Sequence, residues 1–390
     1  MYYQWCTESI IENAISNKKG IIKTITNTFQ NKWFQFVLEN KDKRWDWEYL
    51  SFHPFLKWEH VIDNMDLPWD WNALIRNRNI TLDIIKSNME KPWIFTKNGI
   101  SAININSNIT WNDIINNPEF DWNFGTLAFH KNITWDIIQN TPHKQWVYDM
   151  FSYNPNLTID IVKNNPNIPW KWNIISYNKN ITFKTIRDNP NYPWDFQYFN
   201  ALNKTITYEQ VKNNPDFPWD MEILMFRLPI KKEQLYDNIL RRYWNQIRQN
   251  PNVEWDVIEE LHINKGNRLE NPINDPCSPE YAGHLTLKSQ ENLYSCLSAN
   301  VNLTYEIINK YYLQRWHYSK ISNNPNITFD IVRNNPDEKW NWTQLSYNRM
   351  EKTLLKYINN NIKIIYENIK KYTNEDIAYI IIQNLIQEQS

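Results

Sequence analysis

The chain has 390 residues, with 42 basic and 43 acidic side chains and a formal net charge of -1. A charge this close to zero provides no overall field for gathering nucleic acid or an anionic membrane, so such binding needs a local patch. Hydrophobic residues make up 42% of the chain and include 21 tryptophans, whereas there are 5 glycines. This composition excludes a disordered chain and differs from that of an ordinary enzyme.

The N-terminal sequence and the cysteines indicate the compartment. The first residues, MYYQWCTESI, lack the basic start and apolar run of a signal peptide, and no apolar stretch approaches the ~20 residues of a membrane span. The three cysteines, Cys6, Cys277 and Cys296, are too few and too scattered for a disulfide scaffold, which fits a reducing compartment. We therefore expect a soluble cytoplasmic protein without a membrane partner.

Residues 1–32 differ from the sequence that follows them. Thr7 is placed to cap a helix that continues through Ile10, Ile11 and Ala14. The segment lacks the tryptophan that recurs at a fixed place in the rest of the chain. We predict that residues 1–32 form an N-terminal helical cap.

Residues 33–350 contain an internal repeat of about 24 residues. The residues that mark its register are mostly threonines that follow Asn-Ile or Asn-Leu, and several are 24 residues apart: Thr81, Thr110, Thr134, Thr158, Thr182, Thr207, Thr304 and Thr328. Tryptophan follows twelve residues after the marker at most registers, as in Trp45, Trp69, Trp93, Trp122, Trp146, Trp170, Trp194, Trp219, Trp316 and Trp340, with Tyr243 as a replacement. A sustained period of this length is typical of a repeat architecture.

Each repeat predicts two short helices. The marker threonine is a helix cap, an acid two residues later suits the positive end of the helix, and an Asn-Pro pair such as Asn165-Pro166 ends it. A second proline, such as Pro169, suits the first position of a second helix that carries Trp-x-Trp and closes at Ser-x-Asn. Isolated helices shorter than ~12 to 15 residues are marginal in water, so these helices must stack on the neighbouring repeats.

The predicted fold is therefore all-α. We expect an α-solenoid, or superhelix, of about thirteen to fifteen repeats with helical end caps, in which the second helix of a repeat is α or 3-10. Stacked helix layers ~8 to 10 Å apart would make a curved rod more than about 100 Å long. Five extra residues interrupt the pattern near Thr96–Ser101, and residues 262–300 are irregular. Residues 351–390 predict longer helices that form a C-terminal cap.

The sequence of the repeat resembles two known groups of repeat proteins. The layout of Asn-Pro, Thr-Ile, Asn-Asn-Pro and Ser-x-Asn at 24-residue spacing resembles the leucine-rich variant repeat, which implies alternating α and 3-10 helices. The Pro-Trp-x-Trp and Asn-Asn-Pro wording of residues 33–350 looks like the repeat proteins of giant amoeba-infecting viruses, such as Mimivirus. That likeness implies a viral origin, in the host cytoplasm or the virion, and no activity. The cysteine group associated with an iron-sulfur cluster in the leucine-rich variant family has no counterpart here.

The sequence lacks a recognisable reaction centre. The glycines are isolated, which argues against dinucleotide-binding and phosphate-binding loops, and no Gly-x-Ser-x-Gly elbow is present. Cys277, His284 and Cys296 could converge with Asp275, but core positions in a distorted repeat explain them better than a metal site does. The Asn-x-Thr triplets are turn and cap residues. We expect no catalytic residue, metal or cofactor.

Two groups of basic residues are candidates for binding. Lys163, Arg187, Lys212 and Arg333 share a register, five residues after the marker, and such a row could follow a chain of phosphates. Asp160, Glu209 and Asp330 lie three residues before three of these bases, so neutralised pairs within each helix are the alternative. A second cluster contains Arg241 and Arg242 beside Tyr243, whose register suggests the core.

These observations favour a non-enzymatic repeat scaffold that binds one or more protein partners through its extended surface. The alternative is a nucleic-acid-binding α-solenoid that uses the basic residues on one face. An enzyme concealed in residues 262–300 is a third hypothesis, with the least support.

Overall fold

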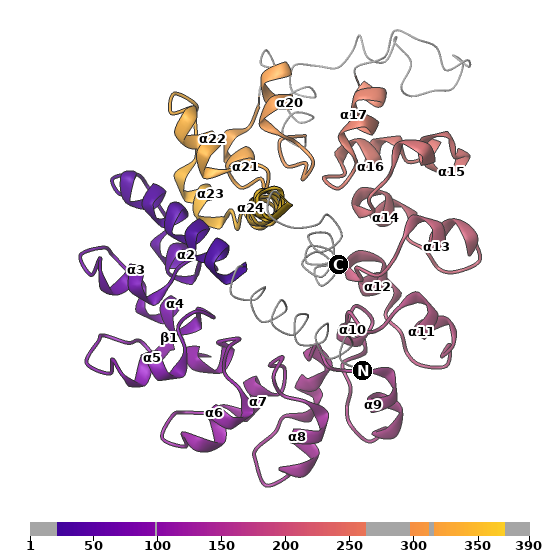
Figure 1. Ribbon diagram of the computed structural model, residues 1–390. Coiled ribbons are helices and arrows are strands. Elements are labelled where there is room, and N and C mark those ends of the chain that lie inside the picture. Colours follow the sequence, from indigo (N-terminus) through magenta and orange to yellow (C-terminus); the bar gives the residue numbers. More distant parts are fainter. Residues whose placement is uncertain (1–21, 98–99, 263–296, 312–315, 371–390) are drawn as a thin grey trace, which may run out of the picture.

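A computed structural model describes residues 22–97, 100–262, 297–311 and 316–370. In these ranges the chain is all-α, with many short helices and a single two-stranded hairpin. The helices are arranged in a circle that the chain follows once, from indigo to orange (Figure 1). None of the described helices combines the length and apolarity needed to cross a membrane.

The first helix of each sequence repeat belongs to an outer set, which Figure 1 shows most clearly for α5, α9 and α11. The outer helices are α3 (Trp58–Ile62), α5 (Leu82–Lys86), α6 (Trp111–Asn116), α8 (Trp135–Asn140), α9 (Ile159–Asn164), α11 (Phe183–Arg187), α13 (Tyr208–Asn213), η3 (Lys232–Tyr236), α15 (Asn238–Arg241), α17 (Trp255–His262), α20 (Tyr305–Lys310) and α22 (Phe329–Asn334). The predicted caps are confirmed. In α9, for example, the Thr158 side chain accepts a hydrogen bond from Ile161 N, and the helix ends before Asn165-Pro166.

The second helix of each repeat belongs to an inner set, visible in Figure 1 as α4, α7, α10, α12 and α14. The inner helices are α2 (Trp47–Phe52), α4 (Trp71–Arg76), η1 (Ala102–Ile105), α7 (Phe124–Leu127), η2 (Tyr148–Tyr153), α10 (Trp172–Ile175), α12 (Phe196–Leu202), α14 (Met221–Arg227), α16 (Trp244–Gln249), α21 (Tyr318–Ser322) and α23 (Trp342–Tyr347). Two of them, η1 and η2, are 3-10 helices, as the sequence allows.

The predicted start of these inner helices is wrong. Pro193 and Trp194 precede α12, and the helix begins after Asp195, whose side chain accepts a hydrogen bond from Tyr198 N. An aspartate at this position satisfies a free amide of the first turn, which a proline two residues upstream cannot do. The same cap, Asp or Asn, precedes α2, α4, α7, α14 and α23.

Each recurring tryptophan is a packing residue of the core. Trp170, for example, is 7% exposed, and its Nε1 donates a hydrogen bond to Asn165 O at 2.9 Å. Its counterpart in the next repeat, Trp194, meets Trp172 of α10 edge to face, with ring centroids 5.1 Å apart. Equivalent edge-to-face pairs, at 5.0–5.4 Å, are Trp47–Trp69, Trp71–Trp93, Phe124–Trp146 and Tyr318–Trp340. Such pairs stabilise these five junctions between successive inner helices.

The recurring Ser-x-Asn also joins successive inner helices. The Ser176 hydroxyl accepts a hydrogen bond from Asp195 N, the cap of the next inner helix, at 2.8 Å. The buried Asn178 amide donates back to Asn154 O of the preceding repeat at 2.9 Å. Because buried polar groups must be paired, these bonds fix the register between repeats. The sequence predicts this Ser-x-Asn as a helix end but not as the link between repeats.

The two ends of the stack join at one further junction, between α2 and α23, which we call the seam. Asp46 N donates to Ser346 Oγ at 2.9 Å, although the two residues are 300 positions apart in sequence. Trp342 and Trp45 form an edge-to-face pair at 5.1 Å. These contacts reproduce those of the junctions between neighbouring repeats. The chain is therefore closed into a ring (Figure 1).

Closure corrects the prediction of an open curved rod. Each junction turns the chain in the same sense, and the last described repeat returns to the first, so the apolar faces at both ends cover one another. The described residues on either side of residues 263–296 are also in contact, because Val301 N donates a hydrogen bond to Pro251 O at 2.9 Å. The sequence instead predicts a separate helical cap at each end of the chain. Residues 1–21 and 371–390 of these predicted caps lie outside the described residues.

Helix α24 (Glu351–Lys370) lies within the circle, where Figure 1 shows it end-on. Ile358 and Ile362 of α24 form a small apolar cluster with Ile25, which belongs to a helix over residues 22–39. The Tyr357 ring also lies 5.2 Å from Phe29 of that helix. The described parts of the two predicted caps thus contact each other.

The five extra residues near Thr96–Ser101 form a hairpin. Strands β1 (Thr96–Lys97) and β2 (Ile100–Ser101) pair antiparallel and lead directly into η1. Lys97 Nζ lies 3.2 Å from Glu48 Oε2 and 3.3 Å from Asp70 Oδ2. The insertion therefore adds a contact with α2 and with the cap of α4.

Candidate interaction surface

Lys163, Arg187, Lys212 and Arg333, which we call the basic row, lie at the ends of outer helices, and most of these charges are paired. Lys212 is 2.8 Å from Asp237, Arg187 is 3.9 Å from Asp188, and Arg333 is 2.9 Å from Glu39 and 3.3 Å from Asp330. Lys163 is exposed and forms no ion pair within the described ranges. A row in which three of four charges are paired offers little free positive charge for phosphates.

The predicted pairing within each helix is confirmed for Arg333 with Asp330 but is wrong for Lys212. Lys212 of α13 pairs with Asp237, the cap of α15, and this contact raises the pKa of Lys212 and lowers that of Asp237. Similarly, Lys86 lies 3.7 Å from Glu119. A long lysine side chain can reach the next outer segment, which lies beside it in the stack.

The second basic cluster is only partly described. Arg241 ends α15, Arg242 is exposed, and Tyr243 is half-buried. The Lys212–Asp237 ion pair brings the basic row to the start of this helix. The candidate metal ligands Cys277, His284 and Cys296 lie outside the described residues, and no possible metal cluster occurs within those residues.

The inner helices expose a patch that the sequence interpretation missed. Tyr153, Tyr198, Leu202 and Phe226 are each 37–48% exposed and lie on η2, α12 and α14, and Tyr177 follows α10. We call these five residues the inner patch. Tyr177 and Tyr198 are stacked with ring centroids 6.1 Å apart. The pKa of Tyr177 is raised, first by burial and then by the nearby Tyr153 and Tyr198 hydroxyls. These three tyrosines therefore form one cluster.

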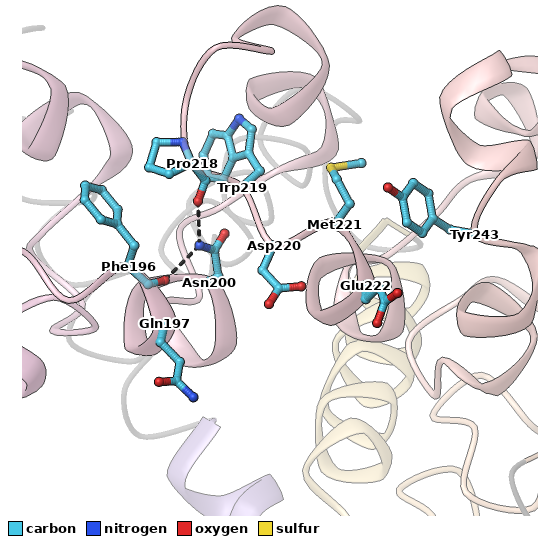
Figure 2. Close-up of a pocket in the computed structure, with 9 residues that line it drawn as sticks. All are labelled: Phe196, Gln197, Asn200, Pro218, Trp219, Asp220, Met221, Glu222 and Tyr243. Atoms are coloured by element: carbon cyan, nitrogen blue, oxygen red, sulfur yellow. Dashed lines mark hydrogen bonds between the residues drawn. The ribbon is translucent and has the colours of Figure 1, made fainter.

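A pocket of about 560 Å³ lies beside the inner patch, between α12 and α14 (Figure 2). Its apolar lining includes Phe196 and Met221 from these two helices, together with Trp219 and the half-buried Tyr243. Its polar lining includes Gln197, Asn200, Asp220 and Glu222, and none of the described residues that line it is basic. The pocket thus combines aromatic rings with two carboxyl groups.

Local sequence changes open this pocket. Phe196 meets Phe217 at 5.4 Å, whereas the equivalent Phe124 meets a recurring tryptophan, Trp146, at 5.0 Å. At the next junction the corresponding residues are Met221 and Tyr243, both smaller than the tryptophans they replace. One extra residue also separates Thr182 from Thr207, which are 25 positions apart rather than 24. These irregularities in the repeat are the signal that could have located the site.

Asn200 occupies the place of the serine that joins other junctions. Its Nδ2 donates to Phe196 O at 2.8 Å and to Pro218 O at 3.0 Å, so its orientation is fixed. Its Oδ1 is buried and accepts no hydrogen bond within the described residues, and Figure 2 shows it on the side of Asp220. A buried acceptor without a donor is costly, so this atom is a site at which a ligand would be stabilised.

Comparisons with known proteins add no family assignment. No protein-family model, curated protein or solved structure matches the chain. The resemblances to the leucine-rich variant repeat and to viral repeat proteins remain predictions from the sequence.

Proposed function

We propose that the chain is an α-solenoid of about thirteen to fifteen repeats, closed into a ring, and that it acts as a scaffold for a protein partner. The support for the repeat interpretation is the recurrence of the threonine caps, the edge-to-face pairs and the Ser-to-amide hydrogen bonds at the spacing of the sequence repeat. In a stack of this kind equivalent residues form continuous surfaces, which suits binding rather than a reaction centre.

The observation that carries this proposal is the inner patch. Its large apolar and aromatic side chains are exposed on three inner segments, η2, α12 and α14, and the half-buried Tyr177 that follows α10 stacks on Tyr198. Tyrosine and phenylalanine are enriched at protein interfaces because they bury a large area at a small cost in conformational entropy. Helix α12 contributes both to the patch, through Tyr198 and Leu202, and to the lining of the pocket between α12 and α14, through Phe196, Gln197 and Asn200.

The nucleic-acid hypothesis has less support. Exposed tyrosines can stack on bases, but such binding also needs unpaired positive charge along the same surface. The basic row lies on the outer helices and is mostly paired, whereas Asp220 and Glu222 line the pocket next to the patch. A carboxyl group close to the stacking surface would repel a phosphate backbone.

The proposed scaffold function can be tested by comparing the proteins that the unaltered chain and its variants capture. The triple variant Tyr153→Ser, Tyr198→Ser, Phe226→Ser removes exposed side chains and should fold normally. We expect native-source proteins that bind the unaltered chain to be lost from this variant, as measured by quantitative mass spectrometry. The control is Met65→Ser, Met89→Ser, Ile115→Ser, which changes exposed apolar side chains of the outer layer.

Equal capture by both triple variants would contradict the proposal. Binding of labelled RNA or DNA that weakens steeply between low and moderate salt, with no protein captured through the patch, would favour the alternative function.

A further inference from the structure

The junction between α12 and α14 differs from seven other junctions of the described residues. At those seven, a side chain on one inner segment accepts a hydrogen bond from the cap amide of the next: Ser51 from Asp70, Asn104 from Asn123, Ser152 from Lys171, Ser176 from Asp195, Ser298 from His317, Ser322 from Asn341 and Ser346 from Asp46. These bonds are 2.8–3.1 Å long. At α12 and α14 the corresponding residues are Asn200 and Asp220, and no such bond joins them in the described structure.

Asn104 shows that an asparagine can close a junction. Its Nδ2 donates to Asp121 O at 3.1 Å, and its Oδ1 accepts from Asn123 N at 3.1 Å. Asn200 makes the equivalent donor contact, with Pro218 O, but its Oδ1 has no donor among the described residues. The open acceptor at Asn200 is therefore specific to this junction and is not a general result of having asparagine there.

The groups around the pocket define the chemistry of an occupant. The Asn200 Oδ1 atom and the carboxylates of Asp220 and Glu222 are hydrogen-bond acceptors. Asp220 Oδ1 already accepts from Ile223 N at 3.0 Å, which holds this carboxylate at the start of α14. The rings of Phe196, Trp219 and Tyr243 supply π faces, to which cations are attracted. An occupant should therefore carry positive charge, several N–H donors and a flat surface.

We propose that this pocket takes an arginine side chain of the protein partner. A guanidinium group is planar, always charged and carries five N–H donors, so it can bond to separate acceptors while it stacks on a ring. A lysine ammonium matches the charge but not the flat shape. The site is a shallow depression of about 560 Å³ that is largely open to solvent, so a side chain projecting from a partner can enter it. This assignment rests on the proposed scaffold function and identifies the chemistry of its partner.

Peptide binding measured by calorimetry tests the assignment. The probe is a ten-residue peptide of glycine, serine and three arginines, compared with peptides in which citrulline or lysine replaces each arginine. We expect the arginine peptide to bind at least about tenfold more tightly than either comparison peptide, because citrulline lacks the charge and lysine the planar fork. Equal binding of the citrulline or lysine peptide, or no detectable binding at millimolar peptide, would overturn the assignment.

Two variants locate the binding. Asn200→Ser introduces the residue that closes the other junctions and should abolish binding of the arginine peptide while preserving the fold. The double variant Asp220→Asn, Glu222→Gln keeps a side chain capable of capping α14 and should weaken binding about tenfold or more. Asp195→Asn is the matched control, because Asp195 has the same capping role at a closed junction, and it should bind as the unaltered chain does.

Unchanged peptide binding in both pocket variants would place the arginine elsewhere and overturn the proposal. The result can be separated from failure of the proposed function by repeating the partner capture with Asn200→Ser. Loss of peptide binding with partner capture retained would refute the pocket as the partner site and leave the inner patch in place. Loss of both supports the assignment.

Discussion

The seam and the junction between α12 and α14 are opposite cases of the same contact. At the seam, segments 300 residues apart form the complete set of contacts, with the Ser346 hydrogen bond and the Trp45–Trp342 pair. At α12 and α14, segments that follow one another in sequence leave the buried Asn200 Oδ1 without a donor among the described residues and a pocket open. Closure of a junction therefore depends on the residues at these positions and not on proximity in the chain.

The largest expected effect comes from emptying the aromatic core of the seam. Trp45→Ala should reduce the free energy of unfolding by about 3–5 kcal/mol, the range for removing a large buried aromatic side chain. Trp45 is 9% exposed and contacts both Phe36 and Trp342. Tyr243→Ala, which removes a ring that lines the pocket from the start of α16, should cost about 1–2 kcal/mol, because Tyr243 is half-buried. Urea unfolding followed by circular dichroism measures both, and equal losses would remove the distinction between the two junctions.

Acid should weaken the seam through His53. This buried ring accepts a hydrogen bond from Phe55 N at its Nδ1, and its Nε2 lies 3.3 Å from Asn348 O across the seam. Burial, the largest influence, lowers the pKa of His53 from 6.5 to about 3. The unfolded chain therefore binds the proton more readily, so stability present above pH 6.5 is lost as the pH falls toward 3, by about 2 kcal/mol at pH 5.

His53→Asn tests this source of acid sensitivity. Asparagine occupies the equivalent position at most other junctions, where it donates to the preceding repeat, as Asn77 does to Ser51 O. Thermal unfolding between pH 7.5 and pH 5 should therefore show a smaller loss of stability in the variant than in the unaltered chain. An identical pH dependence in the two proteins would show that His53 does not govern the seam.

The serine hydrogen bond should account for a smaller share of stability. Ser346→Ala removes the acceptor for Asp46 N and should cost about 1 kcal/mol, as expected for one lost hydrogen bond. Asn200→Ser should have the opposite sign, because it replaces an unpaired acceptor with the group that closes other junctions. Chemical unfolding of both variants tests the comparison, and destabilisation by Asn200→Ser would contradict it.

The smallest expected effect belongs to the exposed Arg333–Glu39 ion pair, which joins α22 to the helix over residues 22–39 where the ring closes. Arg333 lies 2.9 Å from Glu39, but both side chains are about two-fifths exposed. Exposed pairs contribute about 0–1 kcal/mol, so Arg333→Gln should lower stability only slightly, and less so at high salt. A loss above about 2 kcal/mol, insensitive to salt, would mean that this pair and not the aromatic core holds the seam.

The sequence predicts the local structure well because local rules govern it. Thr158 caps a helix, Pro166 follows its end and Trp170 is buried, all as the pattern indicates. The sequence does not predict closure, because the angle at each junction depends on packing between repeats and small changes accumulate around the circle. The pocket was not predicted either. Its signal in the sequence is that Asn200, Met221 and Tyr243 replace the residues usual at their repeat positions, whereas the prediction used only the residues that recur.

The candidate binding residues show the same limit. The charges of Lys212 and Arg333 are paired as the structural alternative anticipated, but Lys212 pairs with the next segment of the stack. Contacts between repeats cannot be assigned from spacing within one repeat. In the inner patch, Tyr153, Tyr177 and Phe226 share one position, nineteen residues after the marker, so part of the patch has a signal in the sequence that the interpretation did not use.

The central claim is that the chain closes on itself, and a distance across the seam tests it most directly. Spin labels attached to Arg44→Cys and Thr343→Cys, with Cys6, Cys277 and Cys296 replaced by serine, report this distance by pulsed electron paramagnetic resonance. The Thr343 hydroxyl donates to Arg44 O at 2.9 Å, so a closed ring gives a short, narrow distance that does not change with protein concentration. A long or broad distribution, or a short distance that disappears on dilution with unlabelled protein, would contradict closure.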